Sequence, residues 1–141
     1  MIEYPIDTSA LWRLLRDGGL RDEWSGPIGA GALHVCEATE IEFLHSAMNA
    51  VHRDELRAEL RMLCAYAPVP ERAWQWVEGA QYRLTQSAQH RSAGPIDLLS
   101  RATAVHHGLT VLHVDHDFAA VARVVSEVDE RDFRAGTSPA E

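Results

Sequence analysis

The sequence predicts an α/β domain of three layers, in which a mostly parallel central sheet is flanked by helices. The first observation is that short apolar runs alternate along the chain with longer segments of helical periodicity. The second is length, because 141 residues, 46% of them hydrophobic, can bury one core but are too few for two domains. We therefore expect one domain over residues 1–133. The small, polar residues 134–141 are expected to form a flexible tail.

The amino-terminal half is expected to contain two strands and several helices. Apolar runs bounded by polar or glycine residues predict the strands, and apolar spacings of three and four residues predict the helices. The expected elements are a strand at 2–6, a helix at 10–16, a helix starting near Leu20, a strand at 31–36, and helices at 39–51 and 54–65. Asp7, Thr8 or Ser9 would lie at the start of the first helix, where a short polar side chain accepts hydrogen bonds from unpaired backbone N–H groups.

The carboxyl-terminal half is expected to continue the alternation of helix and strand. The expected elements are helices at 71–89 and 96–107, a strand at 109–114 and a helix at 118–125. Gly79 lowers the helical propensity of the first of these without excluding a helix. Gly108 fits the left-handed position that commonly ends a helix, and LTVLHV directly after it is the clearest strand of the chain.

The charge balance of the chain is acidic, with 21 Asp and Glu against 13 Lys and Arg and a net charge of −8. This balance argues against a general phosphate-binding surface, so contact with nucleic acid would need bound divalent metal or a local basic patch. Cys36 and Cys64 lack the spacing of a disulfide framework, and free thiols are expected. We recognise neither a secretory signal nor a run of about 18 apolar residues, and therefore expect a soluble, cytoplasmic protein.

Acidic residues stand where strands are predicted to end or helices to begin. They are Asp7, the cluster of Glu37, Glu40 and Glu42, Asp97, and the pair Asp115 and Asp117. Taken singly, each is typical of a helix cap, Asp97 especially, and Glu40 is expected to lie in solvent. Taken together they indicate a cation site, because carboxylates at the ends of parallel strands gather at one edge and repel one another without a cation. Such oxygen ligands suit Mg²⁺ or Mn²⁺, and such a site supports phosphodiester hydrolysis.

Several segments of the chain resemble the motifs of PIN domains, and in particular those of the VapC toxins. The segments are IDTSAL at 6–11, EFLHSA at 42–47, DLLSRATA at 97–104, HGL at 107–109 and DHDF at 115–118. The first resembles the amino-terminal PIN signature. The second resembles the Glu-Leu-Leu-x-Gly-Ala segment of the VapC group, with Ser46 where many members have Gly. The last three resemble the third and fourth acidic motifs, and the resemblance extends from Ile6 to about Val124.

This resemblance implies a PIN-like fold and a metal-dependent endoribonuclease. The acids that it implies for metal binding and catalysis are Asp7, Glu42, Asp97 and Asp115. Asp115 is favoured over Asp117 as the fourth acid because it ends the predicted strand, whereas Asp117 could cap the next helix. Thr8 or Ser9 would form hydrogen bonds within the site and position a carboxylate.

The cofactor implied by the resemblance is Mg²⁺, with Mn²⁺ as an alternative, and Glu37 and Glu40 remain rivals of Glu42 for the second position. The implied partners are an RNA substrate (tRNA, rRNA or mRNA), a VapB-like antitoxin whose tail blocks the active site, and a second copy in a homodimer. The protein would then be the toxin of a type II toxin–antitoxin system. The RNA target, the RNA-binding residues and the number of metal ions are left open.

Two other functions are weighed against this one. The main alternative is a catalytically weak PIN-like module that binds metal or a protein partner. A response-regulator-like domain ranks lower, because no Lys follows a late strand. The arginines at 53, 57 and 61 could form a basic stripe for phosphates or a salt-bridged solvent face, and Trp74, Trp76 and Tyr82 are read as core or dimer interface rather than RNA-stacking residues.

Overall fold

The computed structural model describes residues 2–114 and 117–135, and of residues 117–120 it describes the backbone alone. The strands are β1 (Tyr4–Pro5), β2 (Leu33–Val35), β3 (Ala65–Tyr66), β4 (Val111–His113) and β5 (Glu130–Asp132). The helices are α1 (Thr8–Arg16), α2 (Gly18–Glu23), α3 (Ser25–Gly29), α4 (Glu37–Leu44), α5 (Ala50–Leu63), α6 (Ala73–Gln86), α7 (Pro95–His107) and α8 (Asp117–Val124), with a 3-10 helix η1 at Phe133–Ala135. No helix of the described ranges is long and apolar enough to span a membrane.

The strands form a parallel sheet in two parts. In one part β2 lies between β1 and β3, and in the other β4 pairs with β5, all in parallel. A parallel bridge between Ile6 and Leu112 joins β1 to β4, where the Asp7 backbone N–H donates to the Leu112 carbonyl at 3.0 Å. The strand order is therefore β3-β2-β1-β4-β5, which confirms the predicted parallel sheet. The carboxyl ends of β1 and β4 are neighbours, so Asp7 lies beside the residues that leave β4.

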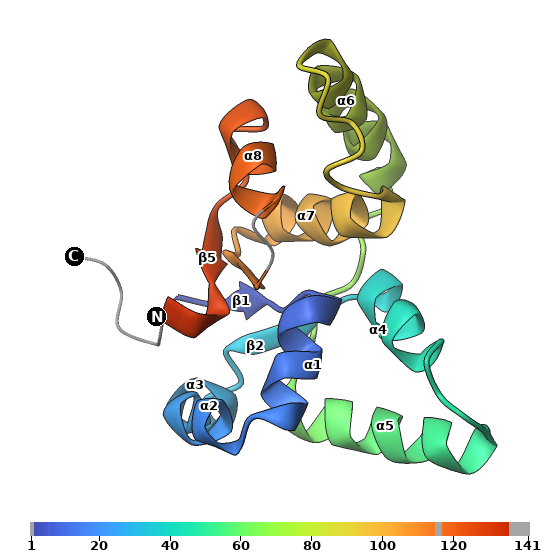
Figure 1. The fold of residues 1–141 in the computed structure, drawn as a ribbon, viewed down its shortest axis with the longest axis vertical. Helices are drawn as coiled ribbons and strands as arrows, with labels where there is room; N and C mark the ends of the chain where they lie inside the picture. Colours follow the sequence, from blue (N-terminus) through green and yellow to red (C-terminus); the bar gives the residue numbers. More distant parts are fainter. Residues whose placement is uncertain (1, 115–116, 136–141) are drawn as a thin grey trace.

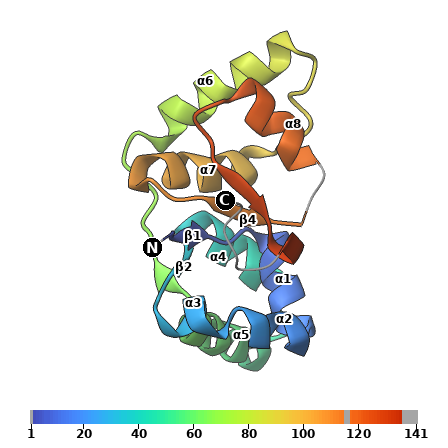
Figure 2. The same ribbon diagram turned by 90° about the vertical axis from the view of Figure 1, so that its left-hand side faces the viewer.

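Helices cover both sides of this sheet, which makes the three layers predicted from the sequence. Figures 1 and 2 show α1, α2, α3 and α5 on one side and α6, α7 and α8 on the other. The side of α1 and α5 has a core that includes Ile6, Leu11, Leu14, Trp24, Leu33, Phe43, Leu60, Leu112 and Phe133. The side of α6 and α7 has a second core that includes Val77, Leu84, Leu98, Leu99, Val111, Val121 and Val125. Val111 and Leu112 belong to different cores, as successive residues of a strand should.

The predicted helix at 39–51 is wrong in extent. Helix α4 ends at Leu44, and α5 starts at Ala50, four residues before the predicted start at 54. Asn49 caps α5, since its side chain accepts a hydrogen bond from the His52 backbone N–H at 2.8 Å. The helical spacing of apolar residues continues through this turn, so it gave no sign of a break. Asn49, a residue type that commonly caps helices, marks where the new helix begins.

The sequence also failed to predict the two edge strands. The β3 residues are exposed and lie where the end of a helix was expected, while β5 has the polar sequence Glu-Arg-Asp. β3 lies in an apolar run, residues 62–67, that continues directly from α5, so the run gave no separate sign of a strand. β5 has no apolar run at all, as an edge strand that pairs on one side only can tolerate. Two other expectations are confirmed: α6 continues through Gly79, and Gly108 ends α7 with a φ of 68°.

Ordered structure extends to the end of the predicted domain. Phe133 is completely buried against Trp24, with ring centroids 4.9 Å apart. Helix η1 includes residues 134 and 135 of the expected tail, and 136–141 lie outside the described residues.

Candidate functional site

Asp7 lies at the junction between β1 and α1 and is almost completely buried, with 5% of its surface exposed. It is the N-cap of α1, and its Oδ1 accepts hydrogen bonds from the Ala10 backbone N–H at 2.9 Å and from Ser9 Oγ at 2.7 Å. The cap that was expected at this position is therefore confirmed. These bonds fix the orientation of a carboxylate that has little access to water.

The electrostatic surroundings of Asp7 oppose its negative charge. Burial raises the pKa of this carboxyl above its ordinary value, and the negative charge of Asp97 raises it further. The hydrogen bonds from Ala10 and Ser9 and the positive charge of Arg101 act in the opposite direction, but the net pKa shift is upward. A carboxylate in these conditions is stabilised by a nearby cation.

Glu42 is brought to the start of α1 by Thr8. Thr8 Oγ1 donates to Glu42 Oε1 at 2.5 Å, although the two residues are 34 positions apart. Glu42 itself is exposed on α4. A carboxylate from α4 therefore stands next to the residue that follows Asp7.

The two rivals of Glu42 have other partners. Glu37 Oε1 accepts from the Val69 backbone N–H at 2.9 Å, which ties α4 to the segment after β3. The expectation that Glu40 lies in solvent is wrong, because it is 5% exposed and its Oε1 is 3.1 Å from Arg57 Nε and 3.9 Å from Arg61. The salt-bridged interpretation of the arginine series on α5 is the one that the contacts of Arg57 and Arg61 favour.

Asp97 is the third residue of α7 and has the capping role that was considered for it. Its Oδ2 accepts from the Gly94 backbone N–H at 3.1 Å. The side chain is half-buried and close enough to Asp7 for the two charges to interact. Asp97 is thus both a helix cap and a member of the acidic site. In the sequence analysis these two roles were weighed as alternatives.

Arg101 is a residue of this site whose burial was not predicted from the sequence. It follows Asp97 by one turn of α7, is completely buried, and donates from Nη1 to the Asp97 carbonyl at 2.9 Å. An arginine among the apolar residues Leu98, Leu99 and Ala102 of α7 was the available signal, since buried arginines need an acidic partner.

Ser9 connects the site to the end of β4. Its Oγ donates to Asp7 and accepts from the Val114 backbone N–H at 3.4 Å. The next residue, Asp115, lies outside the described residues, and the side chain of Asp117 at the start of α8 is not described either. The choice between Asp115 and Asp117 therefore stays a prediction.

The described donors fit a hard divalent cation in kind. Asp7, Asp97 and Glu42 offer carboxylate oxygens, the ligands that Mg²⁺ and Mn²⁺ prefer. Among the side chains that the structure describes, which do not include those of 115–120, there is no group of three His, Cys, Asp or Glu close enough to hold a metal ion. A complete ligand set would thus need a further donor or a closer approach of Glu42.

The histidines and cysteines that the structure describes form no zinc site. His113 pairs with Glu130 on the neighbouring strand, and His34 is 3.6 Å from Glu3. Both cysteines are free, as predicted, and burial raises the pKa of the Cys64 thiol to about 12.

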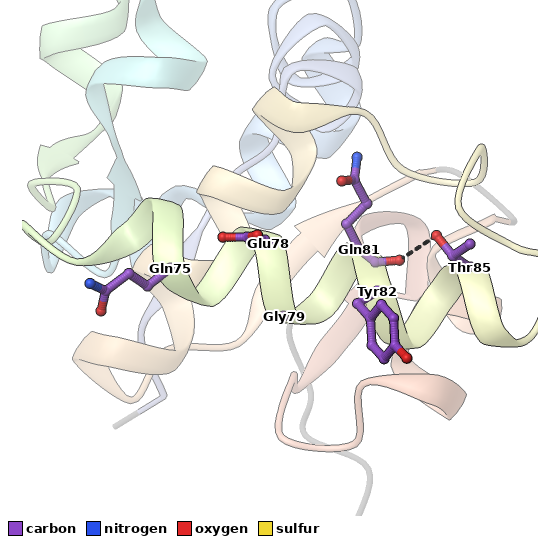
Figure 3. A pocket seen from close by; sticks show the side chains of 6 residues that line it. All are labelled: Gln75, Glu78, Gly79, Gln81, Tyr82 and Thr85. Carbon is purple, nitrogen blue, oxygen red and sulfur yellow. Dashed lines mark hydrogen bonds between the residues drawn. The ribbon is translucent and has the colours of Figure 1, made fainter.

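Two of the three aromatic residues of α6 are exposed. Trp74 and Tyr82 are 62% and 66% exposed and do not lie in the core, so for these two the dimer-interface alternative stays a prediction. Trp76 is partly buried and packs against the core of α6 and α7. Figure 3 shows Tyr82 beside a shallow hollow at Gly79 that is lined by Gln75, Glu78, Gln81 and Thr85. The one charged residue of this lining is acidic, which does not suit a phosphate backbone.

Comparison with known proteins gives consistent matches over most of the chain. The family model of the PIN domain matches residues 4–124. Ribonuclease VapC6 of Mycobacterium tuberculosis is 33% identical over 100 residues, which are 71% of this chain and 79% of the relative. Ribonuclease VapC21 of the same organism is 30% identical over 135 residues, covering 96% and 97% of the two chains.

Solved structures show the same fold at low sequence identity. DNA-bound VapBC from Salmonella typhimurium has a TM-score of 0.74 at 14% identity, covering 94% of this chain and 99% of that one. VapBC-5 from Mycobacterium tuberculosis, a member of the VapBC family of toxin–antitoxin systems, has a TM-score of 0.62 at 20% identity, with coverage of 94% and 99%.

Proposed function

Because this chain belongs to the PIN domain family and to its VapC group, we propose that it is an Mg²⁺-dependent endoribonuclease and the toxin of a type II toxin–antitoxin system. The observation that carries the proposal is the buried Asp7 carboxylate, oriented by Ser9 and Ala10 at the end of a parallel strand and in electrostatic contact with Asp97. Ligand sites of α/β sheets form at this edge. Two relatives that match 96% of this chain are named ribonucleases, which supports the same activity here.

The proposed ligands of the metal are Asp7, Glu42, Asp97 and Asp115, with Mn²⁺ as a possible substitute for Mg²⁺. A bound divalent ion would supply activation of water and stabilisation of charge on the scissile phosphate. Ser9 and the backbone of Ala10 fix the Asp7 carboxylate, and the Gly94 backbone fixes that of Asp97. Thr8 directs Glu42 toward the same edge.

The proposed partners are an RNA substrate, a VapB-like antitoxin and a second copy of the chain in a homodimer, in the cytoplasm. The solved neighbours named VapBC support an antitoxin partner. With a net charge of −8, the chain has little general attraction for RNA, so the metal would provide much of the attraction for the phosphate at the site.

The test is cleavage of a defined panel of tRNA, rRNA and mRNA by purified protein with Mg²⁺ or Mn²⁺, beside EDTA. Asp7→Asn keeps the size of the side chain and its capping ability but loses the charge. Asp22→Asn is the matched control, because Asp22 is an exposed carboxylate on α2. We expect discrete cuts that EDTA and Asp7→Asn abolish and that Asp22→Asn leaves unchanged. Metal binding without cleavage of any RNA in the panel would instead support the catalytically weak binding module.

A further inference from the structure

Arg101 is a cation completely enclosed in the protein at the acidic site. Its exposed fraction is 0%, and it is among the largest side chains that are fully buried. Its Nη1 donates to the Asp97 carbonyl at 2.9 Å, four residues earlier on α7. The side chain therefore runs back along the helix toward its amino end, as long helical side chains do. The guanidinium therefore lies inside the protein, against the backbone of Asp97, and not at the molecular surface.

The charges around Arg101 explain why it tolerates burial. An ionised guanidinium away from water is costly unless acidic groups compensate it. The positive charge of Arg101 lowers the pKa of the Asp7 carboxyl, whereas the negative charge of Asp97 raises it. At Asp7 the positive charge of Arg101 thus offsets part of the repulsion from Asp97.

Other arginines of the described part are engaged elsewhere. Arg57 pairs with Glu40, Arg83 with Glu127 and Arg134 with Asp132. The side chains of these three arginines are 42%, 39% and 41% exposed, so each keeps much of its contact with water. Arg101 differs from them in its complete burial and in its position at the acidic site.

We propose that Arg101 is a positioning residue that acts as a resident cation, holding Asp7 and Asp97 together in the metal-free protein and lowering the affinity of the site for divalent ions. This inference rests on the proposed metal site. A fixed positive charge repels an incoming divalent ion and already satisfies part of the negative potential that would attract it. Complete burial keeps Arg101 from contacting RNA, so its effect is exerted through the acids.

The test is direct titration of the full-length protein with Mn²⁺. Binding is measured by electron paramagnetic resonance, which reports the concentration of the free ion. Arg101→Met removes the charge at similar volume, Arg101→Gln removes it but keeps a hydrogen-bond donor, and Arg101→Lys keeps the charge. We expect the Met and Gln variants to bind Mn²⁺ about tenfold more tightly than the unmodified protein. The Lys variant should stay within about threefold, because its charge is retained.

A second measurement needs no metal and covers the case in which one neutral variant fails to fold. In EDTA, Arg101→Gln should lower the Tm more in the Asp7 protein than in the Asp7→Asn protein, by about 3 °C or more. Equal shifts in the two backgrounds would overturn the proposal, since they would show that Arg101 has only a packing role.

Failure of this inference can be told apart from failure of the proposed function. Mn²⁺ affinity that is unchanged or weaker in both neutral variants overturns the role of Arg101 and leaves the nuclease intact. Tighter Mn²⁺ binding in a protein that cuts no RNA supports the role of Arg101 and contradicts the nuclease. A Lys variant that behaves like the Met variant would also overturn the proposal, because the retained charge would then have no effect.

Discussion

Thr8 Oγ1 and Glu42 Oε1 are joined by a hydrogen bond of 2.5 Å between the first residue of α1 and the middle of α4. Since Thr8 follows Asp7, this contact sets the distance between two proposed ligands from different elements. Thr8→Val keeps the shape of the side chain and removes the donor. We expect Mn²⁺ affinity to fall about tenfold or more, as for other residues that orient a metal ligand. Thr8→Ser, which keeps the hydroxyl, should restore the affinity; a Ser variant as weak as Val would contradict this role.

Glu40 and Glu42 should respond in opposite ways to the same substitution. Glu40→Gln weakens a buried contact with Arg57 and should lower the free energy of unfolding by about 1–3 kcal/mol without changing Mn²⁺ affinity. Glu42→Gln should leave the free energy of unfolding nearly unchanged, because Glu42 is exposed, and should weaken Mn²⁺ binding. Urea unfolding and Mn²⁺ titration of both variants check the pair. Loss of metal binding in Glu40→Gln alone would move the second ligand to Glu40.

Asp7 should make the stability of the metal-free protein depend on pH. Its pKa in the folded protein is raised, so the folded state holds this proton more tightly than the unfolded chain does. The resulting stabilisation is complete below the ordinary pKa of 3.8 and is lost as pH rises through the folded pKa. Urea unfolding over a pH series should therefore show a steeper loss of stability with rising pH for the unmodified protein than for Asp7→Asn. If the free energy of unfolding depends on pH in the same way in both proteins, the pKa of Asp7 is not raised by folding.

The end of the domain should lie just beyond Phe133. Phe133→Ala removes a fully buried ring that packs on Trp24 and should lower the free energy of unfolding by about 3–5 kcal/mol. Truncation after Ala135 keeps this ring and should change the Tm little. Thermal unfolding of both forms makes the comparison, and a large loss of stability in the truncated form would show that residues 136–141 belong to the folded domain.

The sequence predicted those parts of the fold that carry their own apolar pattern. β4 and α7 have such patterns, and Gly108 between them marks the end of the helix. β5 does not, because a short edge strand is specified by its pairing partner and not by its own residues. β3 was missed because the apolar residues 62–67 continue from the end of α5 without a break. The start of α5 was predicted four residues too late, because apolar residues keep a helical spacing before and after Asn49 and so hide the cap at that residue.

The site could also be predicted only in part, because some of its residues are recognised from local sequence and others only from their neighbours in the folded protein. The positions of Asp7 and Asp97 at the starts of helices could be predicted, because polar residues at the start of α1 and Gly94-Pro95 at the start of α7 mark these boundaries in the sequence. The surroundings of Glu40 and Arg101 could not, because they depend on which way α4 and α7 are turned in the packed molecule. A charged residue on a helix is expected in solvent unless the fold supplies its partner.

A metal site at Asp7 and Asp97 can be tested with a crystal structure of the protein soaked with Mn²⁺, in which anomalous diffraction locates the ion. We expect an anomalous peak about 2.1 Å from carboxylate oxygens of Asp7 and Asp97, with Glu42 or Asp115 completing the ligand set. A structure in which Mn²⁺ binds elsewhere, or leaves the Asp7 carboxylate without a metal at saturating concentration, would contradict this prediction.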